Sequence, residues 1–237
     1  MAAPMALKPL SLHVISDSIC PFCYMGYKQL NLAMAAAKKE NLPLDFKLRF
    51  KPFLLDPTLP TDKPLNKREH YDSKFGAANF ARMEKQMAAR GKTVGINFSY
   101  GGNIRQTIDS HRLIEKAFLV GGDEKQRLII DALFGGYFEK EQDVGDHDFL
   151  AECAVQAGVF ASKPDAVAFL ATDELRDGVQ KDITDAKRMG VEGVPFILLN
   201  NKYAVSGAQG EETFLQIFRK IAAGEKLAAD ESSEDTC

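Results

Sequence analysis

The sequence predicts an α/β fold made of a β-α-β half and an α-β-β-α half, with an all-helical insertion between them. Two strand-like segments flank an amphipathic stretch within the first fifty residues, and a second pair of strand-like segments appears only after residue 190. Between them, apolar residues recur at spacings of three and four, which indicates helices. A chain of 237 residues is long enough to bury the core that such a fold needs.

The first half is predicted from residue 11 onward. Residues 11–16 are apolar and β-branched, which is typical of a buried strand. Pro21 suits the first turn of a helix, and apolar residues follow it at helical spacing until Pro43, which cannot continue a helix. From residue 44 to 51 apolar and charged residues alternate, which is the period of a strand with one buried face.

The insertion, residues 59–185, is expected to contain helices only. Apolar stripes predict helical segments at residues 104–118, 128–134, 149–157, 167–170 and 172–189. We expect Thr172 to cap the last of these helices, which also leads into the second half. No linker rich in Pro, Gly or Ser divides the chain, so an insertion into one domain explains the pattern better than two domains in tandem.

The strand pattern returns at residues 194–199, breaks at Asn200-Asn201 and resumes at 203–205. Asparagine tolerates the left-handed backbone of tight turns, so an antiparallel hairpin is predicted, followed by a last helix. This order is that of a thioredoxin-like fold, whose domain we place at residues 10–58 and 186–224. The acidic tail, residues 225–237, is expected to be flexible.

Composition excludes several functions. The chain has 30 basic and 33 acidic residues and no basic run, so no nucleic-acid partner is expected. It shows neither the apolar core of a signal peptide nor the ~20 apolar residues that span a bilayer. We therefore expect a cytoplasmic protein without a membrane partner, and the oligomeric state is left open.

The candidate catalytic residues are Cys20 and Cys23, which enclose Pro21 and Phe22 at a predicted helix start. A helix N-terminus favours a thiolate, so we expect Cys20 to be the accessible attacking thiolate and Cys23 to be the more buried resolving thiol. Metal binding and inert thiols are the alternatives. A structural zinc site needs four ligands, and no second cysteine pair or histidine motif supplies them, so no metal is expected.

The other two cysteines are predicted to play minor roles. Four cysteines placed this unevenly cannot form a disulfide framework for the chain. Cys153 lies on an apolar helix face and is expected in the core. Cys237, the last residue, is interpreted as an incidental exposed thiol, with an auxiliary redox role as the alternative. The pair His111-Arg112 is expected to bond a helix to a loop, with lining of the active-site cleft as the alternative.

Substrate is predicted to bind at Val194 and Pro195, together with Pro21 and Phe22 between the cysteines. A proline that opens a strand cannot donate to the ladder and is confined to edges or special bends. If its peptide bond is cis, the carbonyl and amide of Val194 face the cysteines and can bind an extended peptide or glutathione by strand-like hydrogen bonds.

Three motifs carry a family resemblance. Asp17-Ser-Ile-Cys-Pro-Phe-Cys-Tyr-Met-Gly26, Gly190-Val-Glu-Gly-Val-Pro-Phe196 and Ser206-Gly-Ala-Gln209 resemble the DsbA-like family, and specifically its cytoplasmic FrnE-like branch. The resemblance implies oxidation, reduction or isomerisation of protein or small-molecule disulfides at Cys20. It implies no tightly bound cofactor, with glutathione as a candidate reductant or co-substrate.

Two other functions remain open. Kappa-class glutathione transferases and 2-hydroxychromene-2-carboxylate isomerases look similar in insertion and element order, but they typically carry serine where this chain has Cys20. The presence of both Cys20 and Cys23 favours redox chemistry over a glutathione-dependent transferase or isomerase. The third hypothesis is a chaperone or binding module that uses the groove beside Val194-Pro195 without chemistry.

Overall fold

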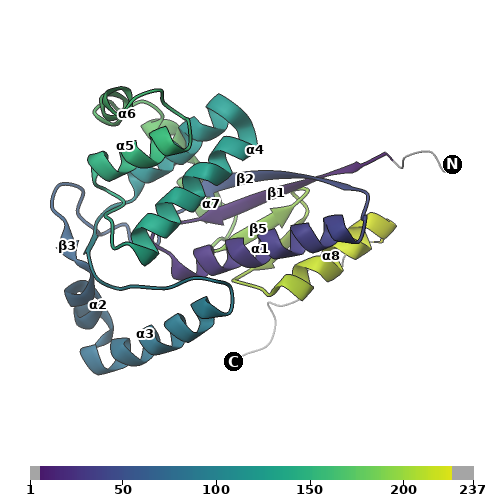
Figure 1. Ribbon diagram of the computed structural model, residues 1–237, viewed down its shortest axis with the longest axis horizontal. Coiled ribbons are helices and arrows are strands. Elements are labelled where there is room, and N and C mark those ends of the chain that lie inside the picture. Colours follow the sequence, from purple (N-terminus) through teal and green to yellow (C-terminus); the bar gives the residue numbers. More distant parts are fainter. Residues whose placement is uncertain (1–5, 226–237) are drawn as a thin grey trace.

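The computed structural model describes residues 6–225 and confirms the α/β class with a thioredoxin-like sheet (Figure 1). The tail prediction lies outside this range except for Glu225. The elements, in chain order, are β1 (Lys8–Ser16), α1 (Pro21–Lys39), β2 (Leu44–Pro52), β3 (Leu65–Asn66), α2 (Lys67–Phe75), α3 (Ala77–Lys92), β4 (Asn103–Ile104), α4 (Ile108–Glu139), α5 (His147–Gln156), α6 (Lys163–Leu170), α7 (Arg176–Arg188), β5 (Phe196–Leu199), β6 (Tyr203–Ser206) and α8 (Glu211–Ala223).

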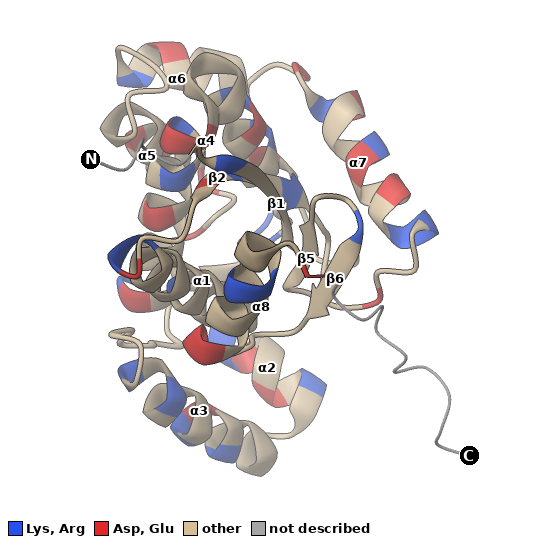
Figure 2. Ribbon diagram, turned by 90° about the vertical axis from the view of Figure 1, so that its right-hand side faces the viewer, with Lys and Arg blue, Asp and Glu red and all other residues tan. Residues whose placement is uncertain are grey.

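The central sheet has the strand order β2-β1-β5-β6, in which β1 and β2 are parallel and β5 is antiparallel to both its neighbours. Helices α1 and α8 lie together on one side of the sheet, and α7 lies on the other (Figure 2). The predicted hairpin is confirmed: Asn200 and Asn201, between β5 and β6, have φ of 50° and 54°. Asparagine adopts this left-handed backbone more readily than most residues, which explains why the turn forms here.

The insertion contains helices α2 to α6, most of α7 and one feature that the sequence did not predict. Ile104 does not begin a helix; it pairs with Leu65 in a two-stranded ladder formed by β3 and β4. The predicted segments 104–118 and 128–134 both fall in or next to α4, which is interrupted at Gly121 and Gly122. Gly122 has φ 65° and ψ −150°, a backbone conformation open essentially to glycine alone.

The start predicted for the last helix of the insertion is wrong. Helix α7 begins at Arg176 rather than Thr172, because the preceding residues form a turn around the guanidinium of Arg112. Arg112 is fully buried, and besides the Asp109 carboxylate it donates hydrogen bonds to the backbone carbonyls of Phe169, Leu170, Thr172 and Glu174. This confirms the structural role expected for Arg112.

The insertion and the sheet share one core. The main cluster of buried apolar side chains runs from β1 and α1 into α4 and α5. Gln126 on α4 is fully buried and bonds the backbone of β2, accepting from the Phe50 amide at 2.6 Å and donating to the Phe50 carbonyl at 3.2 Å.

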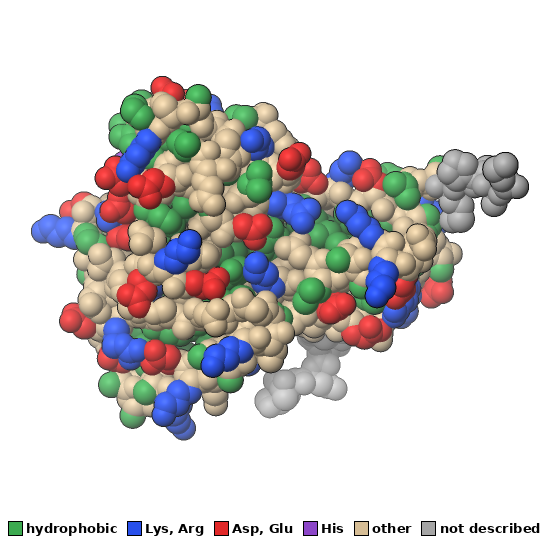
Figure 3. All heavy atoms as spheres, viewed as in Figure 1, with side chains coloured by type: hydrophobic (Ala, Val, Ile, Leu, Met, Phe, Trp, Pro, Cys, Tyr) green, Lys and Arg blue, Asp and Glu red, His purple; other side chains and the backbone are tan. Residues whose placement is uncertain are grey.

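On the surface, basic and acidic side chains are interspersed over the face seen in Figure 3. Among the described residues, no helix is both long and apolar enough to cross a bilayer.

Candidate active site

The helix start predicted at the cysteine pair is confirmed. Cys20 is the N-cap of α1 with an extended backbone (φ −91°, ψ 112°), and Pro21 occupies the first turn. The Cys20 carbonyl accepts the backbone N–H of Cys23 at 3.0 Å, so the two thiols lie on the same helical turn. Both thiols are free. A cysteine at this position lies at the positive end of the helix dipole, which favours a thiolate.

The two thiols are equally buried, contrary to the expectation that Cys20 is the exposed one. Each cysteine is 2% exposed. The Sγ atom of Cys20 is covered because it donates a hydrogen bond to the carbonyl of Val194 at 3.5 Å. The neighbouring Phe22 is 39% exposed and is therefore the part of the Cys-Pro-Phe-Cys segment that meets solvent.

The surroundings of Cys23 suit a resolving thiol. Burial raises the pKa of Cys23 well above its ordinary value, and the hydrogen bond and negative charge of Cys20 raise it further. The Ser16 hydroxyl and the Asp17 backbone act in the opposite direction. Cys23 therefore holds its proton more firmly than an ordinary thiol, which suits the resolving member of a two-thiol exchange.

The loop before β5 faces the cysteines. The Val194–Pro195 peptide bond is cis, and the Val194 amide makes no hydrogen bond within the described part of the chain. Gly26 in α1 lets this loop approach, because a Cβ atom there would lie 3.0 Å from the Pro195 ring. The Pro195 carbonyl accepts the Gly207 amide at 2.9 Å, which ties the loop to the start of the segment leading into α8.

The segment before Cys20 is fixed by buried polar contacts. The Asp17 carboxylate, 1% exposed, accepts the Leu55 amide at 2.7 Å and lies 3.5 Å from Nε2 of His111. The same His111 nitrogen lies 3.0 Å from the Phe53 carbonyl, and can donate to it. His111 thus connects α4 to the loop before the cysteines, which is the helix-to-loop role expected for the His111-Arg112 pair.

The burial of two residues of α2 was not predicted. Lys67 and Tyr71 are one helical turn apart, so they share a face of α2. Burial raises the pKa of Tyr71 to about 12; the hydrogen bond with Tyr137 acts in the opposite direction, and the charge of Cys20 raises the pKa further. Nothing in the spacing of the charged α2 sequence indicates that this face is buried.

Lys67 is buried without a carboxylate partner in the described chain. Its side chain is 1% exposed, and Nζ donates to the Tyr137 carbonyl at 3.1 Å and lies 3.7 Å from the centre of the Tyr137 ring. Burial lowers the pKa of Lys67 to about 8, against the smaller opposing effect of Glu141 and Asp143. The ammonium therefore costs stability at neutral pH.

This burial predicts a pH dependence of stability. Between pH 8 and about 10.5 the unfolded Lys67 binds a proton that the folded one has lost, so the free energy of unfolding rises with pH across this window. The contribution reaches up to about 3 kcal/mol. Urea titrations of the wild type and Lys67→Met at pH 7.5 and 10 should show a difference between the two proteins that changes by about 2 kcal/mol. A constant difference contradicts the prediction.

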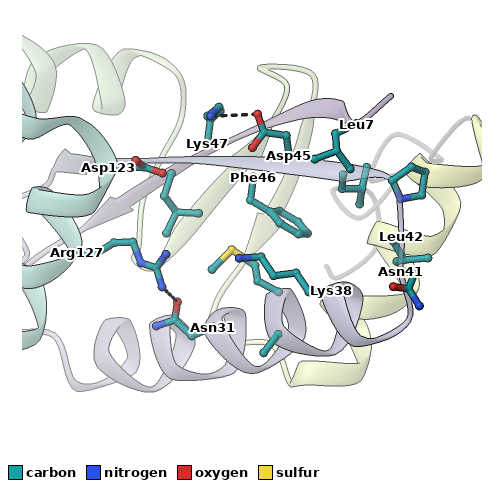
Figure 4. Close-up of a pocket in the computed structure, with 15 residues that line it drawn as sticks. Leu7, Asn31, Lys38, Asn41, Leu42, Asp45, Phe46, Lys47, Asp123 and Arg127 are labelled. Carbon is teal, nitrogen blue, oxygen red and sulfur yellow. Dashed lines mark hydrogen bonds and ion pairs between the residues drawn. The ribbon is translucent and has the colours of Figure 1, made fainter. Parts of the chain in front are cut away.

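A separate groove of about 950 Å³ opens at the far end of α1 (Figure 4). Its walls come from the last turns of α1, the start of β2 and the second part of α4, with Phe46 and Lys38 turned toward the cavity. Neither cysteine lines it. The cysteine pair lies at the opposite end of α1.

The fold and the site together define a class: a thioredoxin-like protein with a helical insertion, a dithiol at the start of α1 and a cis-proline loop opposite it. Comparison with protein families agrees. The model of the DSBA-like thioredoxin domain matches residues 11–219, and the chain belongs to this family. No match was found among curated protein sequences.

Solved structures show the same fold along nearly the whole chain. A "probable DsbA oxidoreductase" from Streptomyces coelicolor is 29% identical, with a TM-score of 0.80 and 96% of each chain covered. The cytosolic disulfide reductase DsbM from Pseudomonas aeruginosa, solved with GSH, is 13% identical with a TM-score of 0.56, covering 90% of this chain and 96% of that one. A 2-hydroxychromene-2-carboxylate isomerase is 14% identical with a TM-score of 0.57, covering 91% and 100%.

Proposed function

We propose that this protein is a thiol-disulfide oxidoreductase or isomerase that uses Cys20 and Cys23 on protein or small-molecule disulfides. One observation carries the proposal: two free thiols lie on the first turn of α1, and the Val194 carbonyl lies 3.5 Å from the sulfur of Cys20. The family membership supports it.

The exchange has two steps. The Cys20 thiolate attacks one sulfur of the substrate disulfide, which forms a mixed disulfide and releases the other sulfur as a thiolate. Cys23 then loses its proton and attacks the Cys20 sulfur, which releases the second substrate thiol and leaves a Cys20–Cys23 disulfide. The protein loses two electrons and the substrate gains them. The reverse sequence oxidises a substrate dithiol.

We assign substrate binding to two groups of residues that flank the Cys20 sulfur. On one side, the unpaired Val194 amide and its carbonyl, held by the cis Pro195, can pair with an extended peptide backbone or with glutathione. On the other side, Pro21 and the exposed Phe22 offer an apolar surface. We propose a cytoplasmic location, in which glutathione serves as reductant; the cytosolic DsbM, solved with GSH, is a structural neighbour consistent with this.

The proposal is tested by equilibrating the protein in glutathione redox buffers and counting free thiols by alkylation and mass spectrometry. We expect one reversible two-electron transition confined to Cys20 and Cys23, and its midpoint defines the direction of electron flow in a given compartment. If the pair forms no intramolecular disulfide at any ratio of reduced to oxidised glutathione, the dithiol proposal fails.

The same chain offers a test against the glutathione-transferase alternative. A transferase or isomerase of the kappa type needs a single activating group at position 20 and no resolving thiol. Cys23→Ser should therefore leave such an activity intact but stop disulfide turnover. Retained conversion of an electrophile with glutathione, together with unaltered kinetics in Cys23→Ser, favours the transferase.

A further inference from the structure

Helix α3 carries unneutralised positive charge and contacts the Cys-Pro-Phe-Cys segment through Arg90. It carries four basic residues, Arg82, Lys85, Arg90 and Lys92, and one acidic residue, Glu84. Glu84 is already ion-paired with Arg68 of α2 at 2.5 Å. Among the described residues, none of the four basic side chains of α3 forms an ion pair. The basic positions of α3 are coloured blue on the ribbon of Figure 2, in a chain whose formal net charge is −3.

The basic helix reaches the active site through Arg90. The guanidinium carbon of Arg90 lies 5.5 Å from the centre of the Phe22 ring. Phe22 stands between the two cysteines in sequence and is 39% exposed, whereas the Cys20 sulfur is covered by Val194. A disulfide that approaches Cys20 therefore meets Phe22 and the exposed Arg90 first.

We propose that Arg90 makes this site selective for anionic disulfides, meaning those that carry a carboxylate within a few bonds of the sulfur atoms; this inference rests on the proposed redox function. A guanidinium binds a carboxylate through two parallel hydrogen bonds, and it attracts the anion before contact. Stacking against Phe22 restrains the Arg90 side chain, so less rotational freedom is lost when the carboxylate binds.

One acidic residue works against this preference. Glu192 is exposed and belongs to the same loop as Val194, two residues before it. Its charge repels an anionic substrate, whereas that of Arg90 attracts it. Removing this charge by Glu192→Gln therefore increases the preference, while removing the charge of Arg90 decreases it.

The test uses three small disulfides of similar length and different charge: 3,3′-dithiodipropionate (anionic), 2-hydroxyethyl disulfide (neutral) and cystamine (cationic). The reduced protein is mixed with each, and the second-order rate constant of its oxidation is followed by quenching with an alkylating agent and mass spectrometry. Each turnover converts the Cys20–Cys23 dithiol to its disulfide and the reagent to two thiols. The readout is the ratio of anionic to neutral rate constants, in which any general loss of reactivity cancels.

The wild type should favour the anionic reagent by about fivefold over the neutral one and disfavour cystamine. Arg90→Gln should bring the ratio close to one, Arg90→Glu should invert it, and high salt should weaken the wild-type preference. Lys39→Gln is the matched control, because it removes one positive charge at the far end of α1 and should keep the wild-type ratio.

Two failures can be told apart. If wild type and Arg90→Gln are oxidised with the same ratio, charge selection by Arg90 is overturned and the redox function stands. If the wild type is oxidised by none of the three reagents, the proposed function itself is overturned, and the inference with it.

Discussion

Cys20→Ser should reduce the rate of disulfide turnover by at least about a thousandfold, to the background of the uncatalysed reaction. The serine hydroxyl cannot form the mixed disulfide, and among the described residues only the Cys20 thiol bonds the Val194 carbonyl. The rate is measured with insulin as the protein disulfide and dithiothreitol as the reductant.

Cys153 provides the matched control. It is also a buried free thiol, 3% exposed, and burial raises its pKa to about 12, so it stays protonated and unreactive. Cys153→Ala should keep the activity of the wild type. Cys23→Ser should behave differently from both, because Cys20 still attacks but the mixed disulfide is no longer resolved and accumulates as an adduct visible by mass. Turnover retained by Cys20→Ser contradicts the proposed roles.

The second large effect concerns stability. Arg112→Ala should lower the free energy of unfolding by about 3 to 5 kcal/mol, because it leaves several buried carbonyls and the Asp109 carboxylate without their donor. The loss should be seen as a lower urea midpoint in equilibrium unfolding.

Comparison with Arg176→Ala separates the stabilising effect of a buried guanidinium from that of an exposed ion pair. Arg176 also contacts the Asp109 carboxylate, at 3.2 Å, but its side chain is 40% exposed. Its removal should cost less than about 1 kcal/mol. Equal effects of the two substitutions would show that the turn before α7 does not depend on the buried guanidinium of Arg112.

The parts of the fold that depend on local patterns were predictable. The start of α1 follows from Pro21, and the β5–β6 hairpin follows from Asn200-Asn201, since both positions impose a backbone conformation on their own. The two candidate catalytic cysteines were recognised for the same reason: their spacing and their place at a helix start are properties of a short segment.

The parts that depend on distant contacts were not predictable. The burial of Cys20 results from Val194, far away in sequence, and the start of α7 results from Arg112. The contact of Arg90 with Phe22 could not be predicted, because an arginine is common on a charged helix and the two residues meet only in the folded chain. Lys67 was missed because a lysine is normally solvated, and only the packing of α2 against Tyr137 removes it from water.

The Gln126 side chain protects an edge strand of the sheet from pairing with another molecule of the same protein. An outermost strand exposes a row of amide and carbonyl groups with which a strand of another chain can pair, and such pairing begins many aggregates. Strand β2 is outermost in the sheet, and the Gln126 side chain occupies both polar groups of Phe50. The inserted helix α4 therefore shields part of the rim of the sheet from intermolecular β-pairing.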